Sequence, residues 1–244
     1  MFAPKRLFLA APAITIMAIF AWAGTIPSIS WAQGSATAGA PAQTMKEFPK
    51  DVDPNSGFRL PSLKREDLDE SGKKVFDEIL GPGGRTLVGQ RGPTGIRLYS
   101  PKVAKMEYEV SQYLRYHSGL SGSVRELAIL ITAREMDNPF EWAAHEPQGL
   151  KDGVPQSIID VVKYRKGVEG LPETEAVIIQ LGRQIFGKKK VDSDTFARAL
   201  KIFGPKHLVD LVGLMGSYSA TAALLATFDM QLDAKQKQYV LPMP

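Results

Sequence analysis

Apolar residues recur every three or four positions through most of the chain after residue 60, and this is the spacing of amphipathic helices. The pattern predicts helices over residues 63–80, 101–117, 121 or 123 to 136, 139–147, 155–166, 172–186, 192–203 and 207–232. No stretch alternates apolar and polar residues between turn signals, so the sequence predicts no strand. We therefore expect an all-α fold, with seven or eight helices in a single domain.

Glycine and proline mark the ends of these helices. Residues 81–95 hold six glycines and two prolines. We expect a loop there, because the segment lacks the Gly-Lys-Ser/Thr ending of a phosphate-binding loop. Gly204 and Pro205 separate the last two predicted helices. Pro147 lacks a backbone donor, so the helix around it should bend or end there.

The residues of two predicted helices indicate how these helices pack. On the helix over 101–117, five large apolar residues share one face: Val103, Met106, Val110, Tyr113 and Leu114. The helix over 207–232 is long, apolar and rich in small residues that permit close helix–helix approach. A membrane span would have a similar composition, but charged residues flank the apolar part. We therefore expect a helix buried in the core or in an oligomer.

The candidate chemistry lies within residues 125–150, where two predicted helices flank a break at residues 137–139. Glu141 and His145 are four positions apart, so they share one helix face. If the two helices pack as a hairpin, Glu126 comes close to that face. A buried carboxylate beside a histidine is a suitable pair for proton transfer.

Glu126 has a second interpretation. Residues 123–126 read Ser-Val-Arg-Glu and fit the capping box S-x-x-E, in which the glutamate serves only the backbone of its own helix. Both roles stay open at this point. The other two histidines are expected to be structural, with His117 at a helix end and His207 at the surface.

The same region carries a family resemblance. Its motifs are R-E-x-A-I-L from Arg125, A-R at 133–134, F-E-W-x-x-H ending at His145, and G-L-K-D-G-V at 149–154. They resemble the carboxymuconolactone decarboxylase family, which also contains the alkylhydroperoxidase D-like proteins. The resemblance covers roughly residues 60–232. It implies one helical bundle of the alkylhydroperoxidase D-like type over residues 61–235, followed by a C-terminal tail over 236–244.

The resemblance implies a cofactor-free decarboxylation of a small lactone or cyclic carboxylic acid. In the family, 4-carboxymuconolactone loses carbon dioxide to give a β-ketoadipate enol-lactone. This reaction requires that the electron pair left by the carbon dioxide is delocalised and that a carbon atom is then protonated. His145 would deliver the proton, Glu126 would orient it and Glu141 would assist. Arg134 and Trp142 are the expected substrate-binding residues. The resemblance also implies a homo-oligomer, a trimer or a hexamer.

Other functions are weighed against this one. The chain has no cysteine, which excludes the thiol chemistry of the related peroxidases; Asn138 and Glu141 stand where those proteins have a Cys-x-x-Cys motif. Two carboxylates and a histidine could bind a metal, but the spacing E-x-x-x-H differs from the E-x-x-H of di-iron bundles, so we expect none. A binding or structural homologue on the same scaffold is the alternative, because fold does not fix function.

Residues 1–32 have the pattern of a secretory signal, with a basic start, an apolar run over 7–24 and small residues before a cleavage site at Gln33. An uncleaved anchor is the rival, but Pro12 interrupts the apolar run. We expect export to a periplasm without stable membrane association, and a flexible arm over 33–60. The net charge of +4 gives no reason to expect nucleic acid, which leaves a small molecule as the expected partner.

Overall fold

The computed structural model describes residues 48–243. The predicted signal segment over 1–32 and the predicted arm up to residue 47 lie outside the described residues, as does Pro244.

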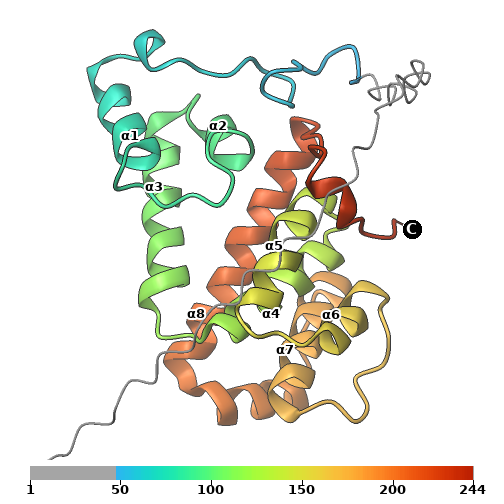
Figure 1. Ribbon diagram of the computed structural model, residues 1–244. Helices are drawn as coiled ribbons and strands as arrows, with labels where there is room; N and C mark the ends of the chain where they lie inside the picture. The colour runs from blue at the N-terminus through green and yellow to red at the C-terminus, as the bar shows by residue number, and fades with distance from the viewer. Residues whose placement is uncertain (1–47, 244) are drawn as a thin grey trace, which may run out of the picture. The chain divides into compact units, whose positions relative to one another are not determined.

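Helices form the whole regular structure of the described residues, so the predicted all-α fold is confirmed (Figure 1). Short helical turns accompany them: η1 (Arg65–Asp67), η2 (Tyr113–His117), η3 (Gln184–Lys188) and η4 (Gln236–Gln238). The α-helices are α1 (Glu70–Leu80), α2 (Pro93–Arg97), α3 (Pro101–Gln112), α4 (Gly122–Glu135), α5 (Pro139–Lys151), α6 (Gln156–Lys163), α7 (Glu173–Arg183) and α8 (Ser193–Thr227).

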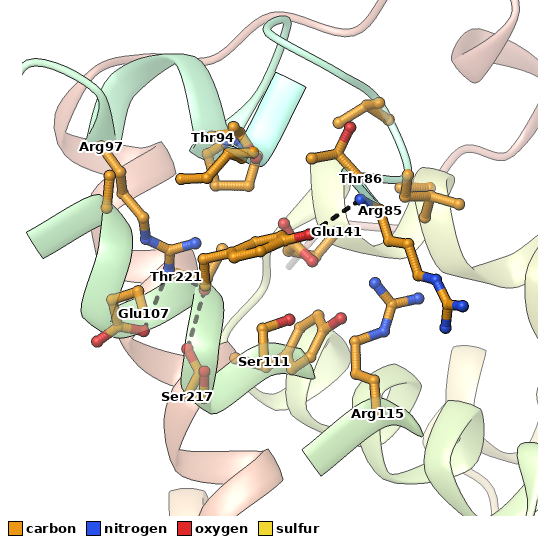
Figure 2. Close-up of a pocket in the computed structure, with 18 of the residues that line it drawn as sticks. Arg85, Thr86, Thr94, Arg97, Glu107, Ser111, Arg115, Glu141, Ser217 and Thr221 are labelled. Carbon is orange, nitrogen blue, oxygen red and sulfur yellow. Dashed lines mark hydrogen bonds and ion pairs between the residues drawn. The ribbon is translucent and has the colours of Figure 1, made fainter. Parts of the chain in front are cut away.

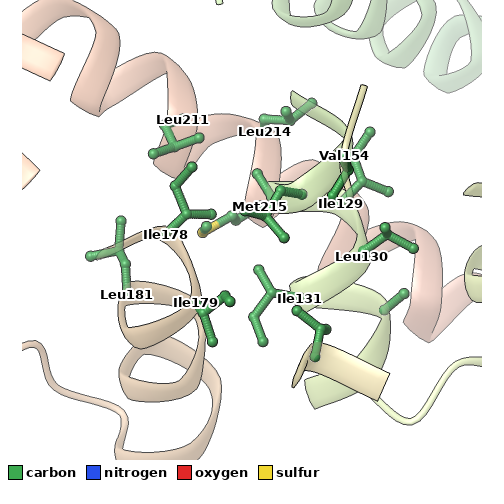
Figure 3. Packing of buried hydrophobic residues seen from close by; sticks show 14 of the residues in the cluster. Ile129, Leu130, Ile131, Val154, Ile178, Ile179, Leu181, Leu211, Leu214 and Met215 are labelled. Carbon is green, nitrogen blue, oxygen red and sulfur yellow. The ribbon is translucent and has the colours of Figure 1, made fainter. Parts of the chain in front are cut away.

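Helix α4 is the centre of the molecule. Its residues from Glu126 to Arg134 are all buried, and it packs against α5, α6, α7 and α8. A helix that is apolar on every side is stable only when neighbours cover all of it. Figure 3 shows this core, in which the isoleucines at 129 and 131 meet Ile178 and Ile179 of α7 and Met215 of α8.

Helix α8 contains the predicted break. Gly204 has φ 67° and ψ 170°, so the direction of the helix changes there, and Pro205 begins the second half. By length and composition α8 is the one described helix that could cross a membrane. In this structure Leu208, Leu211 and Leu214 lie in the main core instead.

The predicted arm over 33–60 does not extend to residue 60. Phe58 is 1% exposed and packs with Phe140 in a second apolar cluster. The backbone nitrogen of Gln231 donates to the Gly57 oxygen at 2.8 Å. The described part of the arm is therefore folded against the domain. At the other end of the chain, Leu241 in the predicted tail lies in the main core.

Two local predictions differ from the structure. Helix α5 continues through Pro147 to Lys151 instead of ending there. Residues 93–97, placed in a loop, form the short helix α2, which Pro93 opens. On α3 the shared apolar face is mostly solvent-exposed, and only Leu114 at its end is buried.

Candidate functional site

The α4–α5 hairpin positions the candidate site. Asn138 caps α5 through its Oδ1, which accepts from the Glu141 backbone nitrogen at 2.9 Å, and Pro139 supplies the first helical residue. The turn before it has a positive φ of 45° at Asp137. This tight reversal lays α5 along α4 and brings the Glu141/His145 face next to Glu126 (Figure 1).

Glu126 binds His145. Its Oε2 lies 2.6 Å from His145 Nδ1, and both side chains are buried. Ser121 provides the cap of α4 by accepting from the Val124 backbone nitrogen at 3.3 Å. The alternative role of Glu126 as a capping residue is therefore excluded.

Arginines hold the second oxygen of Glu126. Arg125 Nε lies 3.2 Å from Oε1, and its terminal nitrogen pairs with Asp152 at 2.6 Å. Arg115 lies 3.9 Å from the same Oε1. Burial alone would raise the pKa of Glu126, but His145 and these two arginines together lower it below its ordinary value. Glu126 is thus an anion that accepts a hydrogen bond from Nδ1–H of His145, which leaves Nε2 on the opposite side of the ring.

Glu141 lies on that opposite side. Its Oε2 is 3.5 Å from His145 Nε2, one helical turn away on α5. Burial raises the pKa of Glu141, and His145, Arg97 and Arg115 oppose this shift only in part. The two carboxyl groups beside one imidazole therefore differ: the pKa of Glu126 is lowered from its ordinary value, whereas the pKa of Glu141 is raised. Such a pair of shifted carboxyls is typical of acid–base sites.

His145 and Glu141 line a cavity of about 90 Å³. Figure 2 labels Glu141 and other residues of its walls. A single buried water needs only about 10–15 Å³ of cavity volume, so the cavity accommodates several waters or a small molecule. The walls come from α1, α2, α3, η2, α5, α8 and the loop at residues 85–88.

Three arginines line this cavity. Figure 2 shows Arg97 on one side of it, and Arg85 and Arg115 on the other. Arg97 is already bound, because it donates to Thr221 Oγ1 at 2.6 Å. Arg115 is 9% exposed, and its buried Nε has no hydrogen-bond partner among the described residues. A buried guanidinium with an unused donor is a natural contact for an anionic ligand.

Tyr218 of α8 completes the surroundings of the histidine. Its ring meets that of His145 edge-on, with 5.1 Å between the centroids and an angle of 86°. Burial raises the pKa of the Tyr218 phenol, so the hydroxyl stays protonated and can donate to a ligand in the cavity.

Two predicted substrate-binding residues lie elsewhere. Arg134 is buried near the end of α4 and pairs with Asp137 at 2.6 Å, away from the cavity lining. Trp142 is fully buried and donates from Nε1 to Glu146 at 2.6 Å. It is one position, or about 100° of helix, beyond Glu141, and this rotation points it into the core rather than the cavity. Neither Arg134 nor Trp142 lines the cavity, so the cavity gives no support to their predicted role in substrate binding.

Sequence reasoning missed Arg97, Arg115 and Tyr218. Arg115 sits in η2, which follows α3, and nothing in the pattern predicts that its backbone oxygen accepts a hydrogen bond from Arg125 of α4 at 2.7 Å. His117, two residues further on, is exposed, and His207 is partly exposed.

Within residues 48–243, no group of three or more histidine, cysteine or acidic side chains is arranged to hold a metal ion. No family model and no curated protein matches the chain.

Proposed function

We propose that the protein is a cofactor-free carbon–carbon lyase that decarboxylates a small lactone or cyclic carboxylic acid, as a member of the carboxymuconolactone decarboxylase family. The observation that carries the proposal is the arrangement around one imidazole. Nδ1 of His145 is fixed by the ionised Glu126 at 2.6 Å, and Nε2 lies beside Glu141 at the cavity. An oriented histidine next to a carboxyl group whose pKa is raised is suited to transferring a proton.

The steps follow from these positions. The bond between the ring carbon and the departing carboxylate breaks, and its electron pair moves into the conjugated carbonyl system as carbon dioxide leaves. Glu141 supplies a proton to Nε2 of His145, and the imidazolium so formed donates this proton to the carbon. Glu126 stabilises the imidazolium while it exists, as a carboxylate at Nδ1 does. The cycle closes when Glu141 takes a proton from solvent.

The arginines would act on the part of the substrate that stays charged. The departing carboxylate loses its charge as carbon dioxide forms, so an ion pair to it would stabilise the substrate more than the transition state. Arg115 is better placed on a retained carboxylate or on the oxygen that gains negative charge. Tyr218, which stays protonated, can donate to the same oxygen.

The test uses the metal-free protein in deuterated buffer with 4-carboxymuconolactone and a panel of related carboxylated lactones. Carbon dioxide is measured, and the product is analysed by NMR. The proposal predicts release of carbon dioxide and one solvent deuteron on the carbon that carried the carboxylate. Ligand binding without turnover on every compound would contradict it and favour a binding protein on the same scaffold.

A further inference from the structure

Arg125 of α4 binds three other residues at once. Its Nε lies 3.2 Å from Oε1 of Glu126. One terminal nitrogen donates to the backbone oxygen of Arg115 at 2.7 Å, and the other donates to Oδ2 of Asp152 at 2.6 Å. The Arg125 side chain is only 14% exposed. Because all three nitrogens of one planar guanidinium are bound, the group is held in a single orientation.

The first contact fixes the carboxylate that binds His145. The last side-chain bond of a glutamate rotates over a broad range unless both oxygens are held. Oε2 of Glu126 lies 2.6 Å from His145 Nδ1, and Arg125 holds the other oxygen. Arg125 therefore sets the plane of the carboxylate, and the carboxylate sets the direction of the imidazole ring.

The second contact fixes the segment that carries Arg115. This segment, η2, is one turn of π-helix, and such turns are frequent at functional sites. Arg125 binds the Arg115 backbone there, while the Arg115 side chain lines the cavity (Figure 2). The Tyr116 ring lies beside both guanidinium groups, with its centroid 5.2 Å from that of Arg115 and 5.9 Å from that of Arg125. The position of the cavity arginine thus depends on Arg125.

The third contact anchors Arg125 to the end of α5. Asp152 follows the last residue of α5, and its Oδ1 accepts from Gln148 at 2.9 Å, so the carboxylate is held on both sides. Gly122, the first residue of α4, lies against it: a Cβ at Gly122 would be 3.1 Å from that of Asp152. The anchor is therefore rigid, because α4 and α5 are in contact at this point.

We propose that Arg125 is the positioning residue of the site, and that it orients His145 through Glu126 and the cavity guanidinium through Arg115. Arg125 does not itself line the cavity, so it acts through these two neighbours. The inference rests on the proposed function for the roles of His145 and Arg115. A lysine cannot replace Arg125, because one ammonium group does not present a planar fork to three acceptors.

The first test is a pair of double-mutant cycles, measured by steady-state kinetics on the lactone that the protein decarboxylates. Arg125→Met should raise KM and lower kcat, each by about tenfold to a hundredfold, because small displacements of binding and catalytic groups have effects of this size. In the Arg115→Leu background it should raise KM no further, and in the Glu126→Gln background it should lower kcat no further. Arg125→Lys keeps the charge without the fork and should lose nearly as much as Arg125→Met.

Arg198→Met is the matched control. Arg198 joins α8 to α7 by donating to Glu173 at 2.7 Å and to Gln180 at 2.8 Å, and it does not line the cavity. Its loss should lower the free energy of unfolding and leave kcat and KM unchanged. Asp152→Asn removes only the anchor of Arg125. It should change kcat and KM in the same direction as Arg125→Met, and it replaces that variant if Arg125→Met does not fold.

The second test needs no turnover. The proton on His145 Nδ1 is held against a carboxylate at 2.6 Å, so it should give a sharp downfield NMR resonance that is absent in His145→Ala. This resonance should broaden through exchange with water in folded Arg125→Met and Arg125→Lys, and stay sharp in Arg198→Met. If no lactone is decarboxylated, the proposed function fails, and the resonance alone decides the positioning role.

Two results would overturn the proposal. An unchanged resonance with unchanged kcat and KM in the folded Arg125 variants would show that this residue only stabilises the fold. Fully additive effects in both double variants would show that Arg125 acts independently of Arg115 and Glu126.

Discussion

Oε2 of Glu126 lies 2.6 Å from Nδ1 of His145, although nineteen positions separate the two residues in the chain. The contact links the two central helices, and both side chains are almost completely buried. It fixes the ring so that Nε2 faces the cavity beside Glu141.

Glu126→Gln should destabilise the fold at neutral pH by about 1–3 kcal/mol, since a buried charge-assisted hydrogen bond is lost while the shape is kept. The pKa of Glu126 is lowered by folding. Its stabilising effect is therefore present above the ordinary value of 4.5 and is lost as the pH falls through the lower folded pKa. Denaturant unfolding between pH 3 and pH 7 should show a shallower acid-side loss in the variant. Glu109→Gln, at an exposed position, is the control and should keep the wild-type pH dependence.

Glu141→Gln should lower the decarboxylation rate about 10²–10⁴-fold, because the acid that reprotonates His145 is removed. In the wild type, burial raises the pKa of Glu141, so activity should fall as the pH rises through that raised pKa. The pH profile of kcat/KM is the measurement. An unchanged falling limb in the variant would show that another group titrates there.

Arg115→Leu should raise KM for a carboxylated lactone by about tenfold to a hundredfold, as expected for the loss of one buried charged contact. Arg115→Lys should recover part of this, because it restores the charge without the planar fork. Arg134→Leu is the informative comparison. It breaks the ion pair to Asp137 but lies away from the cavity, so it should affect stability and leave KM unchanged. Equal KM values for wild type and Arg115→Leu would exclude the proposed role of Arg115.

Trp142→Phe should cost about 1–2 kcal/mol of stability with no change in KM. The indole nitrogen donates to Glu146, which also binds Lys163 at 3.0 Å, so the substitution leaves a buried carboxylate oxygen short of one donor. Thermal unfolding and steady-state kinetics on the same preparation separate the two effects. A raised KM at unchanged stability would instead indicate that Trp142 contributes to substrate binding.

The sequence predicted most of the helices and the central pair, for physical reasons. Helical spacing places Glu141 and His145 on one face, and a short break containing Pro139 forces the reversal that brings Glu126 near them. The same periodicity distinguishes Trp142 from Glu141, because adjacent positions point about 100° apart. Closeness in sequence to His145 is the only ground for a substrate role of Arg134, and it says little about direction on a helix.

Contacts between distant parts of the chain cannot be predicted from the local pattern of apolar and polar residues. The spacing of apolar residues correctly predicts an apolar face on α3. It cannot say whether the chain's own core or another molecule covers that face. Arg115 reaches the cavity because the η2 turn packs against α8, a contact almost a hundred positions away in the chain. Phe58 falls within the predicted flexible arm over 33–60, yet it packs with Phe140 and Ile96.

The most direct measurement is carbon dioxide release from 4-carboxymuconolactone and related lactones by metal-free wild type, His145→Ala and Glu126→Gln, each checked for folding by circular dichroism. The account predicts turnover by the wild type. It predicts a turnover rate at least about a hundredfold lower in His145→Ala, and a lowered rate in Glu126→Gln as well. Turnover that survives in folded His145→Ala would contradict the assignment of the proton to this histidine.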